Sequence, residues 1–104
     1  MLGEFEQLVL LAILREDDAF GASIQRSIAE QGGRDVSLGA VYTTLARLEQ
    51  KGLIEGWVGE PTAERGGRRR RHYRVLSPGR RELEASLATL RRMARGLTPR
   101  LELP

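Results

Sequence analysis

The stretch RGGRRRRHYRV, from Arg65 to Val75, decides how the rest of the chain is interpreted. It holds six arginines within ten residues, in a chain that has a single lysine. Such a run is either a disordered tail that binds any polyanion or part of a folded hairpin that presents its charges on one surface. Tyr73 and Val75 lie two residues apart with a polar residue between them, which is the period of a strand with one buried face. The strand is therefore favoured over the tail.

Composition places the chain among small globular proteins that bind polyanions. Its 104 residues are about one domain, and 40% hydrophobic with 30% charged residues is a globular composition. The net charge is only +3, but acidic residues gather near the N-terminus and arginines from Arg65 onward. This asymmetry indicates a polyanion bound at one face, nucleic acid before membrane. An ordinary solvated surface explains the composition equally well.

Several function classes lack the residues they need. Without cysteine and with His72 as the single histidine, neither a metal site nor a cofactor is expected. His72 also lacks an acid or nucleophile partner, so we expect a phosphate contact or plain solvent exposure there and no enzyme activity. The apolar run from Leu8 to Leu14 is far shorter than the roughly 20 residues of a membrane span, and the N-terminus is acidic. A cytoplasmic protein with no membrane partner is expected.

Hydrophobic periodicity predicts four helices and one hairpin. Helices are expected over 2–16, over 21–31, from Leu38 to a stop at Gly52, and over 78–97, with Ser37 and Ser77 as N-caps. Strands are expected around 53–58 and 71–75, joined by a loop over about 60–67. The predicted fold is mostly α with a small β-hairpin: a winged helix-turn-helix with a C-terminal dimerisation helix. We divide it into a winged-helix DNA-binding domain (1–76), the dimerisation helix (77–98) and a flexible tail (99–104).

The third predicted helix is the candidate for reading DNA. Its apolar stripe, which we expect to face inward, is Leu38, Val41, Leu45 and Leu48. The flanks and outer face then carry Gly39, Ala40, Tyr42, Thr43, Thr44 and Arg47. Small side chains near the N-terminus let a helix approach base edges closely, and its free amides can meet a phosphate. An ordinary amphipathic helix that begins with small residues is an equally good interpretation of this segment alone.

Three separated segments resemble the PadR family of bacterial transcriptional regulators. They are LGEFEQLVLLAILREDDAFGASI near the N-terminus, VSLGAVYTTLARLEQKGLI from Val36 to Ile54, and GEPTAERGGRRRRHYRVLSPGRREL from Gly59 to Leu83. The family commonly has proline after its serine and after its tyrosine, where this chain has Leu38 and Thr43. The single C-terminal helix is similar to the shorter branch of the family.

The resemblance implies a homodimeric repressor that binds double-stranded DNA at a palindromic operator. In many members a small aromatic or lipophilic effector near the dimer interface releases the DNA. By position, the family's recognition helix would meet DNA through Ser37, Gly39, Ala40, Tyr42 and Thr43, and its wing through Gly67, Arg68, Arg69 and Arg70. Helical spacing adds Arg47, and strand alternation adds Arg74, as further DNA-facing residues.

The last helix carries an apolar seam that predicts a dimer. The seam spans barely two heptads, so it needs a further partner, and the wide apolar face of the first helix supplies one. The expected interface is Leu2, Phe5, Leu8, Val9, Leu83, Leu87, Leu90, Met93, Ala94 and Leu97. The alternative is that this helix folds back on its own domain. Part of the same set could line an effector pocket, but an ordinary dimer core is the better explanation.

A second function from another class stays open. The basic hairpin could bind RNA or an acidic protein partner, in a winged-helix interaction module. Single-stranded RNA readers usually display stacking aromatic side chains, and the third helix offers only Tyr42. Duplex DNA is therefore the preferred ligand.

Overall fold

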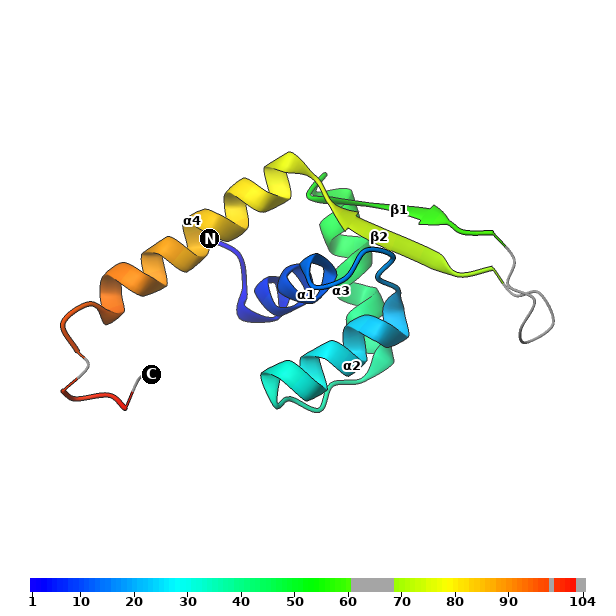
Figure 1. The fold of residues 1–104 in the computed structure, drawn as a ribbon. Helices are drawn as coiled ribbons and strands as arrows, with labels where there is room; N and C mark the ends of the chain where they lie inside the picture. Colours follow the sequence, from blue (N-terminus) through cyan, green and yellow to red (C-terminus); the bar gives the residue numbers. More distant parts are fainter. Residues whose placement is uncertain (61–68, 98, 103–104) are drawn as a thin grey trace.

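The computed structural model describes residues 1–60, 69–97 and 99–102. Its elements are α1 (Glu4–Leu14), α2 (Gly21–Gly32), α3 (Leu38–Gln50), β1 (Ile54–Val58), β2 (Arg71–Val75) and α4 (Ser77–Ala94). Figure 1 shows α1, α2 and α3 gathered in one body, with the β1–β2 hairpin projecting on one side and α4 leaving on the other. The predicted fold class, a winged helix-turn-helix with a C-terminal helix, is confirmed.

One hydrophobic core joins the three helices to the base of the hairpin. Val9 and Leu10 of α1, Ile24 of α2, and Leu45 and Leu48 of α3 are all completely buried or nearly so. Their spacing puts one apolar stripe of each helix against its neighbours, as amphipathic helices require. The core sets the position of α3, whose opposite face is left in solvent.

The start of α4 is held against β1 by a close backbone approach. Leu76 N–H donates to the carbonyl of Leu53 at 2.9 Å, just before the helix begins. A Cβ at Gly79 would collide with that same carbonyl, so only glycine fits there. The residue that caps the helix is Leu76, not the predicted Ser77, because Ser77 already has helical geometry.

The C-terminal half of α4 extends beyond the body of the protein (Figure 1). Leu90, Met93 and Leu97 expose 49%, 74% and 37% of their surface on this segment and the turn after it. The helix ends at Ala94, short of the predicted 97, and Gly96 follows with φ of 81°. An apolar seam therefore lies in solvent in the single chain.

Three residues predicted for a dimer interface belong instead to the core of the single chain. Leu2, Val9 and Leu83 are 4%, 0% and 3% exposed, because the N-terminal segment and α1 pack beside the first half of α4. Leu2 N–H also donates to Ser86 Oγ at 3.2 Å. Side chains without exposed surface cannot contribute to a contact with a second subunit, so the prediction for these three is corrected.

A half-buried ion pair joins α1 to the end of α3. Glu6 Oε2 accepts a hydrogen bond from Lys51 Nζ at 2.7 Å, and its Oε1 accepts one from Gly3 N–H at 3.1 Å. The Glu6 side chain is 11% exposed, whereas that of Lys51 is 47% exposed. The hydrogen bond from Lys51 lowers the pKa of Glu6 below its ordinary value of 4.5, and this outweighs the opposite effect of burial.

Glu6→Gln should therefore destabilise the protein in a pH-dependent way. A lowered pKa means that the carboxylate stabilises the fold above pH 4.5, and that this contribution is lost as the pH falls through the pKa of the folded state. We expect a loss of about 1 kcal/mol in the free energy of unfolding at pH 7, shrinking below pH 4.5. Urea denaturation at pH 7 and at a pH below 4.5 measures the two losses.

The matched control is Glu4→Gln, because Glu4 pairs with Arg34 at 2.8 Å but is 73% exposed. Its effect should stay below about 0.5 kcal/mol at either pH. An equal loss for Glu6→Gln at both pH values would show that the carboxylate's charge contributes nothing.

Candidate nucleic-acid interface

Ser37 caps the N-terminus of α3. Ser37 Oγ accepts a hydrogen bond from Ala40 N–H at 3.0 Å, which satisfies one of the free amides of the first turn. Ser37 therefore has a structural role as well as its predicted place in the interface. Gly39 and Ala40 follow it, and both are exposed.

The outer face of α3 carries the predicted DNA-facing residues, with two corrections. Gly39, Ala40, Tyr42, Thr43 and Arg47 are all exposed. Thr44 is 4% exposed and faces the core, because it lies between Val41 and Leu48 on the buried stripe. Leu38 was expected to face inward but is 37% exposed, since it opens the helix where no other element covers it. Sequence reasoning also missed Ala46, which is exposed and shares the outer face with Gly39 and Thr43.

Tyr42 lies against the beginning of α2. A Cβ at Gly21 would come within 2.5 Å of both the ζ carbon and the hydroxyl oxygen of Tyr42, so glycine makes room for the ring. The side chain remains 47% exposed. Its hydroxyl thus lies beside the first residue of α2, where backbone amides are also free to meet an anion.

The wing, which is the hairpin of β1 and β2, has one face toward the body and one toward solvent. In the antiparallel register Gly56 pairs with Tyr73, while Glu55 pairs with Arg74 and Trp57 with His72. Tyr73 is buried, and burial raises its pKa. Trp57 is half-buried, with its ring 5.6 Å from that of His72 and the Arg74 guanidinium 5.7 Å above it. Trp57 therefore packs within the hairpin.

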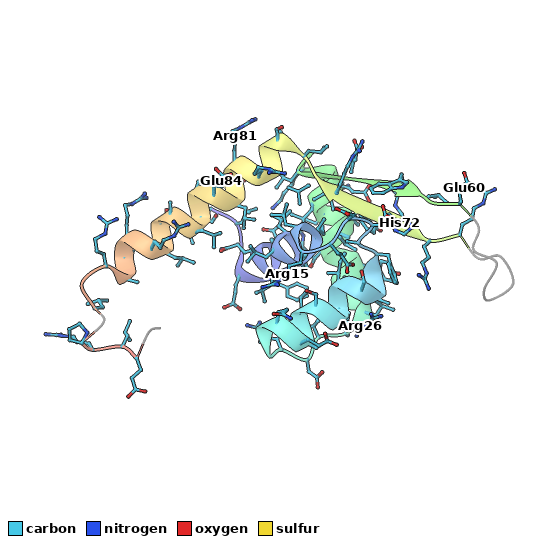
Figure 2. The ribbon with its side chains drawn as sticks, viewed as in Figure 1. Arg15, Arg26, Glu60, His72, Arg81 and Glu84 are labelled. Carbon is cyan, nitrogen blue, oxygen red and sulfur yellow. The ribbon has the colours of Figure 1, made fainter. Side chains whose placement is uncertain are left out.

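His72 anchors the wing to the turn between α1 and α2, which corrects the expectation of a phosphate contact or a solvent-exposed ring. Its Nδ1 lies 2.8 Å from the carbonyl oxygen of Asp18, and because a carbonyl only accepts, Nδ1 is the donor. The ring also meets Phe20 edge-on, 6.1 Å between centroids. Tyr73 N–H donates to Ala19 O at 2.9 Å beside it. Figure 2 shows His72 on β2, where the hairpin meets the helices.

Arg71 links the wing to α3. Its guanidinium donates to Glu49 Oε2 of α3 at 2.8 Å and lies 5.8 Å from the centre of the Tyr73 ring. The hydrogen bond to Glu49 raises the pKa of Arg71. A Cβ at Gly56 would lie 2.9 Å from the guanidinium, so the glycine leaves space for it. As strand alternation predicts, Arg71 shares a face with Tyr73.

The arginines of the wing are not equally available to a ligand. Arg74 Nε donates to Glu55 at 2.6 Å, and the Arg70 guanidinium lies 4.3 Å above the Phe20 ring. Arg69 is exposed. The predicted wing residues Gly67 and Arg68 lie outside the described residues. The structure therefore joins β2 to the last turn of α3 through Arg71 and Glu49, and it also shows acidic partners of Arg71 and Arg74 that sequence reasoning missed.

A comparison with protein families identifies the chain. The model of the transcriptional regulator PadR-like family matches residues 10–85. The chain belongs to this family. The match includes α3, the hairpin and the start of α4, and so contains the candidate interface of this PadR-like protein. No curated protein matches the chain significantly.

Solved PadR structures share the fold. A PadR family transcription regulator from Clostridium difficile is 23% identical, with a TM-score of 0.76 over 93% of this chain and 97% of that one. A transcriptional regulator from Clostridium thermocellum is 20% identical, with a TM-score of 0.73 over 90% and 89%. Bacillus subtilis PadR in complex with operator DNA is 21% identical, with a TM-score of 0.65; the match covers 81% of this chain and 48% of that protein.

Neither a metal centre nor a membrane span is found in the parts of this PadR-like chain that the structure describes. Residues 1–60, 69–97 and 99–102 contain no group of three or more histidine or acidic side chains placed to hold a metal. No helix within the same ranges has the length and apolar content needed to cross a bilayer.

His72→Phe tests whether the histidine is a structural anchor. Phenylalanine keeps the ring between Trp57 and Phe20 but leaves the Asp18 carbonyl without its donor, so we expect a loss of about 1 kcal/mol in the free energy of unfolding. His72→Ala removes both contacts and should lose about 2 kcal/mol. Urea denaturation gives the values. Arg74→Ala, on the exposed side of the same strand, is the control and should change stability by less than about 0.5 kcal/mol. Equal, small losses for all three variants would rule out the anchor.

Proposed function

We propose that this protein is a dimeric, sequence-specific DNA-binding transcriptional regulator that represses a nearby promoter by occupying a palindromic operator. The observation that carries the proposal is the exposed outer face of α3, which begins with small residues, together with an arginine-bearing wing that is joined to the last turn of α3 through Arg71 and Glu49. The operator complex of Bacillus subtilis PadR, which has the same fold, supports the assignment. In this proposal residues 1–76 bind DNA and α4 holds two copies together.

The side chains around α3 divide between bases and phosphates. The outer face of α3 enters the major groove, where Gly39 and Ala40 allow a close approach. Tyr42 and Arg47 flank this face and carry donors suited to phosphate oxygens. The wing adds Arg69, with Gly67, Arg68, Arg70 and Arg74 as further contacts to the backbone. Arg70 and Arg74 contribute less, because each already has a partner within the protein.

The dimer is supported by two apolar surfaces that the single chain leaves open. One is the seam of α4, in which Leu87 and Ala94 are partly buried and Leu90, Met93 and Leu97 are exposed. The other is a hollow of about 340 Å³ between α1 and α2, lined in part by Leu8, Leu11, Leu14 and Ile28. Burial of both against a second copy removes apolar surface from water, which is the main driving force for association. Phe5, beside this core, completes the proposed interface.

A small lipophilic or aromatic effector could enter the same interface and release the operator. Phe5, Leu8, Leu87, Leu90 and Met93 would line such a site. We favour a packed dimer core for these residues, because a core accounts for all of them without a ligand.

The alternative, RNA or an acidic protein partner on the basic hairpin, is less well supported. Base-stacking RNA readers need exposed aromatic rings. Besides the buried ring of Tyr73, the rings of Phe20 and Trp57 lie in or beside the hairpin, and both already have partners. Phe20 lies under the guanidinium of Arg70, and Trp57 of β1 lies against the ring of His72. Tyr42 is the single aromatic residue of α3, and it is exposed.

Selection of bound duplexes from a random DNA pool tests the function. We expect a palindrome with half-sites roughly 34 Å apart, one helical turn, because a symmetric dimer presents two α3 helices. On the enriched duplex, Arg47→Ala and Arg69→Ala should each reduce the slope of log K against log salt by about 0.9. The control is Arg81→Ala, since Arg81 projects from α4 away from the wing in Figure 2. Preferential binding of an RNA pool, or no enrichment of any duplex, would move the assignment to the alternative.

Sedimentation equilibrium tests the dimer. Leu90→Glu together with Met93→Glu places two charges on the exposed seam, and we expect the mass to fall from two chains to one, with operator affinity reduced by at least tenfold. The control is Arg92→Glu, which changes the charge by two on the opposite side of α4 and should leave the dimer intact. A wild-type protein that sediments as a single chain would refute the dimer directly.

A further inference from the structure

The ridge of α3 that points farthest from the core is small and apolar. Val41, Leu45 and Leu48 mark the buried side of the helix. At 3.6 residues per turn, the positions opposite them are Gly39, Thr43, Ala46 and, at the C-terminal end of the helix, Gln50, and all four are exposed. No heavy atom outside the local helix backbone lies within 4 Å of a Cβ built on Gly39, so this end of the ridge is open.

The one hydroxyl on this ridge already uses its hydrogen in a hydrogen bond within the helix. Thr43 Oγ1 donates to the carbonyl oxygen of Gly39, one turn earlier, at 2.9 Å. A threonine hydroxyl has a single hydrogen, so in this arrangement it can accept from a base but cannot donate to one. Gly39 has no side chain, and Ala46 offers only a methyl group. From Gly39 to Ala46 the ridge therefore presents two methyl groups and no free side-chain donor.

This lack of donors limits what the ridge can recognise in the major groove. Guanine N7 and O6, adenine N7 and thymine O4 are all acceptors and need a donor from the protein. The thymine C5 methyl group needs only an apolar partner, and alanine and threonine methyl groups are suited to it. Among the base edges of the major groove, thymine methyl is the one feature that both Thr43 and Ala46 fit.

We propose that Gly39, Thr43 and Ala46 form a ridge that recognises thymine methyl groups in the major groove, with Thr43 and Ala46 as specificity-determining residues. This inference rests on the proposed DNA-binding function and names the feature of the operator that α3 reads. Tyr42 and Arg47 lie on the two sides of the ridge and contact the DNA backbone. Gln50, the last residue of α3, continues the ridge about 6 Å beyond Ala46 and lies outside the N-terminal part of the helix that contacts base edges in helix-turn-helix proteins.

The test uses wild-type protein and the duplex enriched by selection. Each thymine is replaced in turn by deoxyuracil, which keeps the base pair and the phosphate but lacks the C5 methyl group. Affinity should fall about fourfold at each contacted thymine, the loss expected for one methyl group removed from an apolar contact. Replacement at thymines outside the contacted positions is the internal control and should leave affinity unchanged.

Two substitutions of Thr43 separate its methyl group from its hydroxyl. Thr43→Val keeps a methyl group in the same place and removes the hydroxyl, so the preference for thymine over uracil should remain. Thr43→Ser keeps the hydroxyl and removes the methyl group, so the preference should disappear at one position of each half-site. Ala46→Gly should remove the preference at another position, with circular dichroism as a check that α3 still folds.

The outcomes separate this inference from the function on which it depends. If no duplex binds above background, the DNA-binding function itself is wrong. If the duplex binds tightly but uracil is tolerated at every position, DNA binding stands and the methyl-reading ridge is overturned. Loss of discrimination in Thr43→Val with retention in Thr43→Ser would also overturn it, because the hydroxyl would then be the reading group.

Discussion

A two-stranded hairpin is marginally stable by itself in water, so the wing depends on the contacts that hold β2 to the helices. Two adjacent residues, His72 and Tyr73, make two of them. Tyr73 is buried and its N–H donates to the carbonyl of Ala19, while His72 Nδ1 donates to the carbonyl of Asp18. Both acceptors lie in the turn between α1 and α2, whose backbone carbonyls have no helical partner. The turn and the wing thereby complete each other's hydrogen bonding.

Because of this anchoring, the arginines of the wing both make contacts within the protein and present charge on its surface. Arg71 and Arg74 are held by Glu49 and Glu55, and Arg70 lies over the Phe20 ring. These contacts are partly exposed, so each contributes little to stability, but together they limit how far the guanidinium groups can reorient. A basic segment held in this way presents charge along a defined line and gives orientation to a bound polyanion. A free tail with the same composition would supply affinity without orientation.

Sequence reasoning found the elements and the stripe of α3 because both follow from local periodicity. The helices, the glycines that end α2 and α3 with φ of 65° and 73°, and the burial of Tyr73 all have local causes. The partners of the arginines could not be found in that way. Glu49 lies 22 residues before Arg71, and Asp18 lies 54 residues before His72, so only the packed chain brings them together. The prediction for Thr44 is wrong because the inward stripe was limited to apolar residues, whereas helical spacing puts Thr44 between Val41 and Leu48 on the buried side.

The methyl-reading ridge proposed for α3 makes sequence preference depend on a second copy of the chain. A recognition helix whose base contacts are methyl groups gains only a modest free energy at each thymine, far less than a bidentate arginine–guanine pair supplies. The arginines add affinity that is the same on every sequence. One copy of this chain would therefore hold DNA with little preference among sites. Two copies joined through α4 double the number of base contacts and also require a fixed spacing between them. In the proposed function the apolar seam of α4, far from the proposed base contacts, is thus part of sequence recognition.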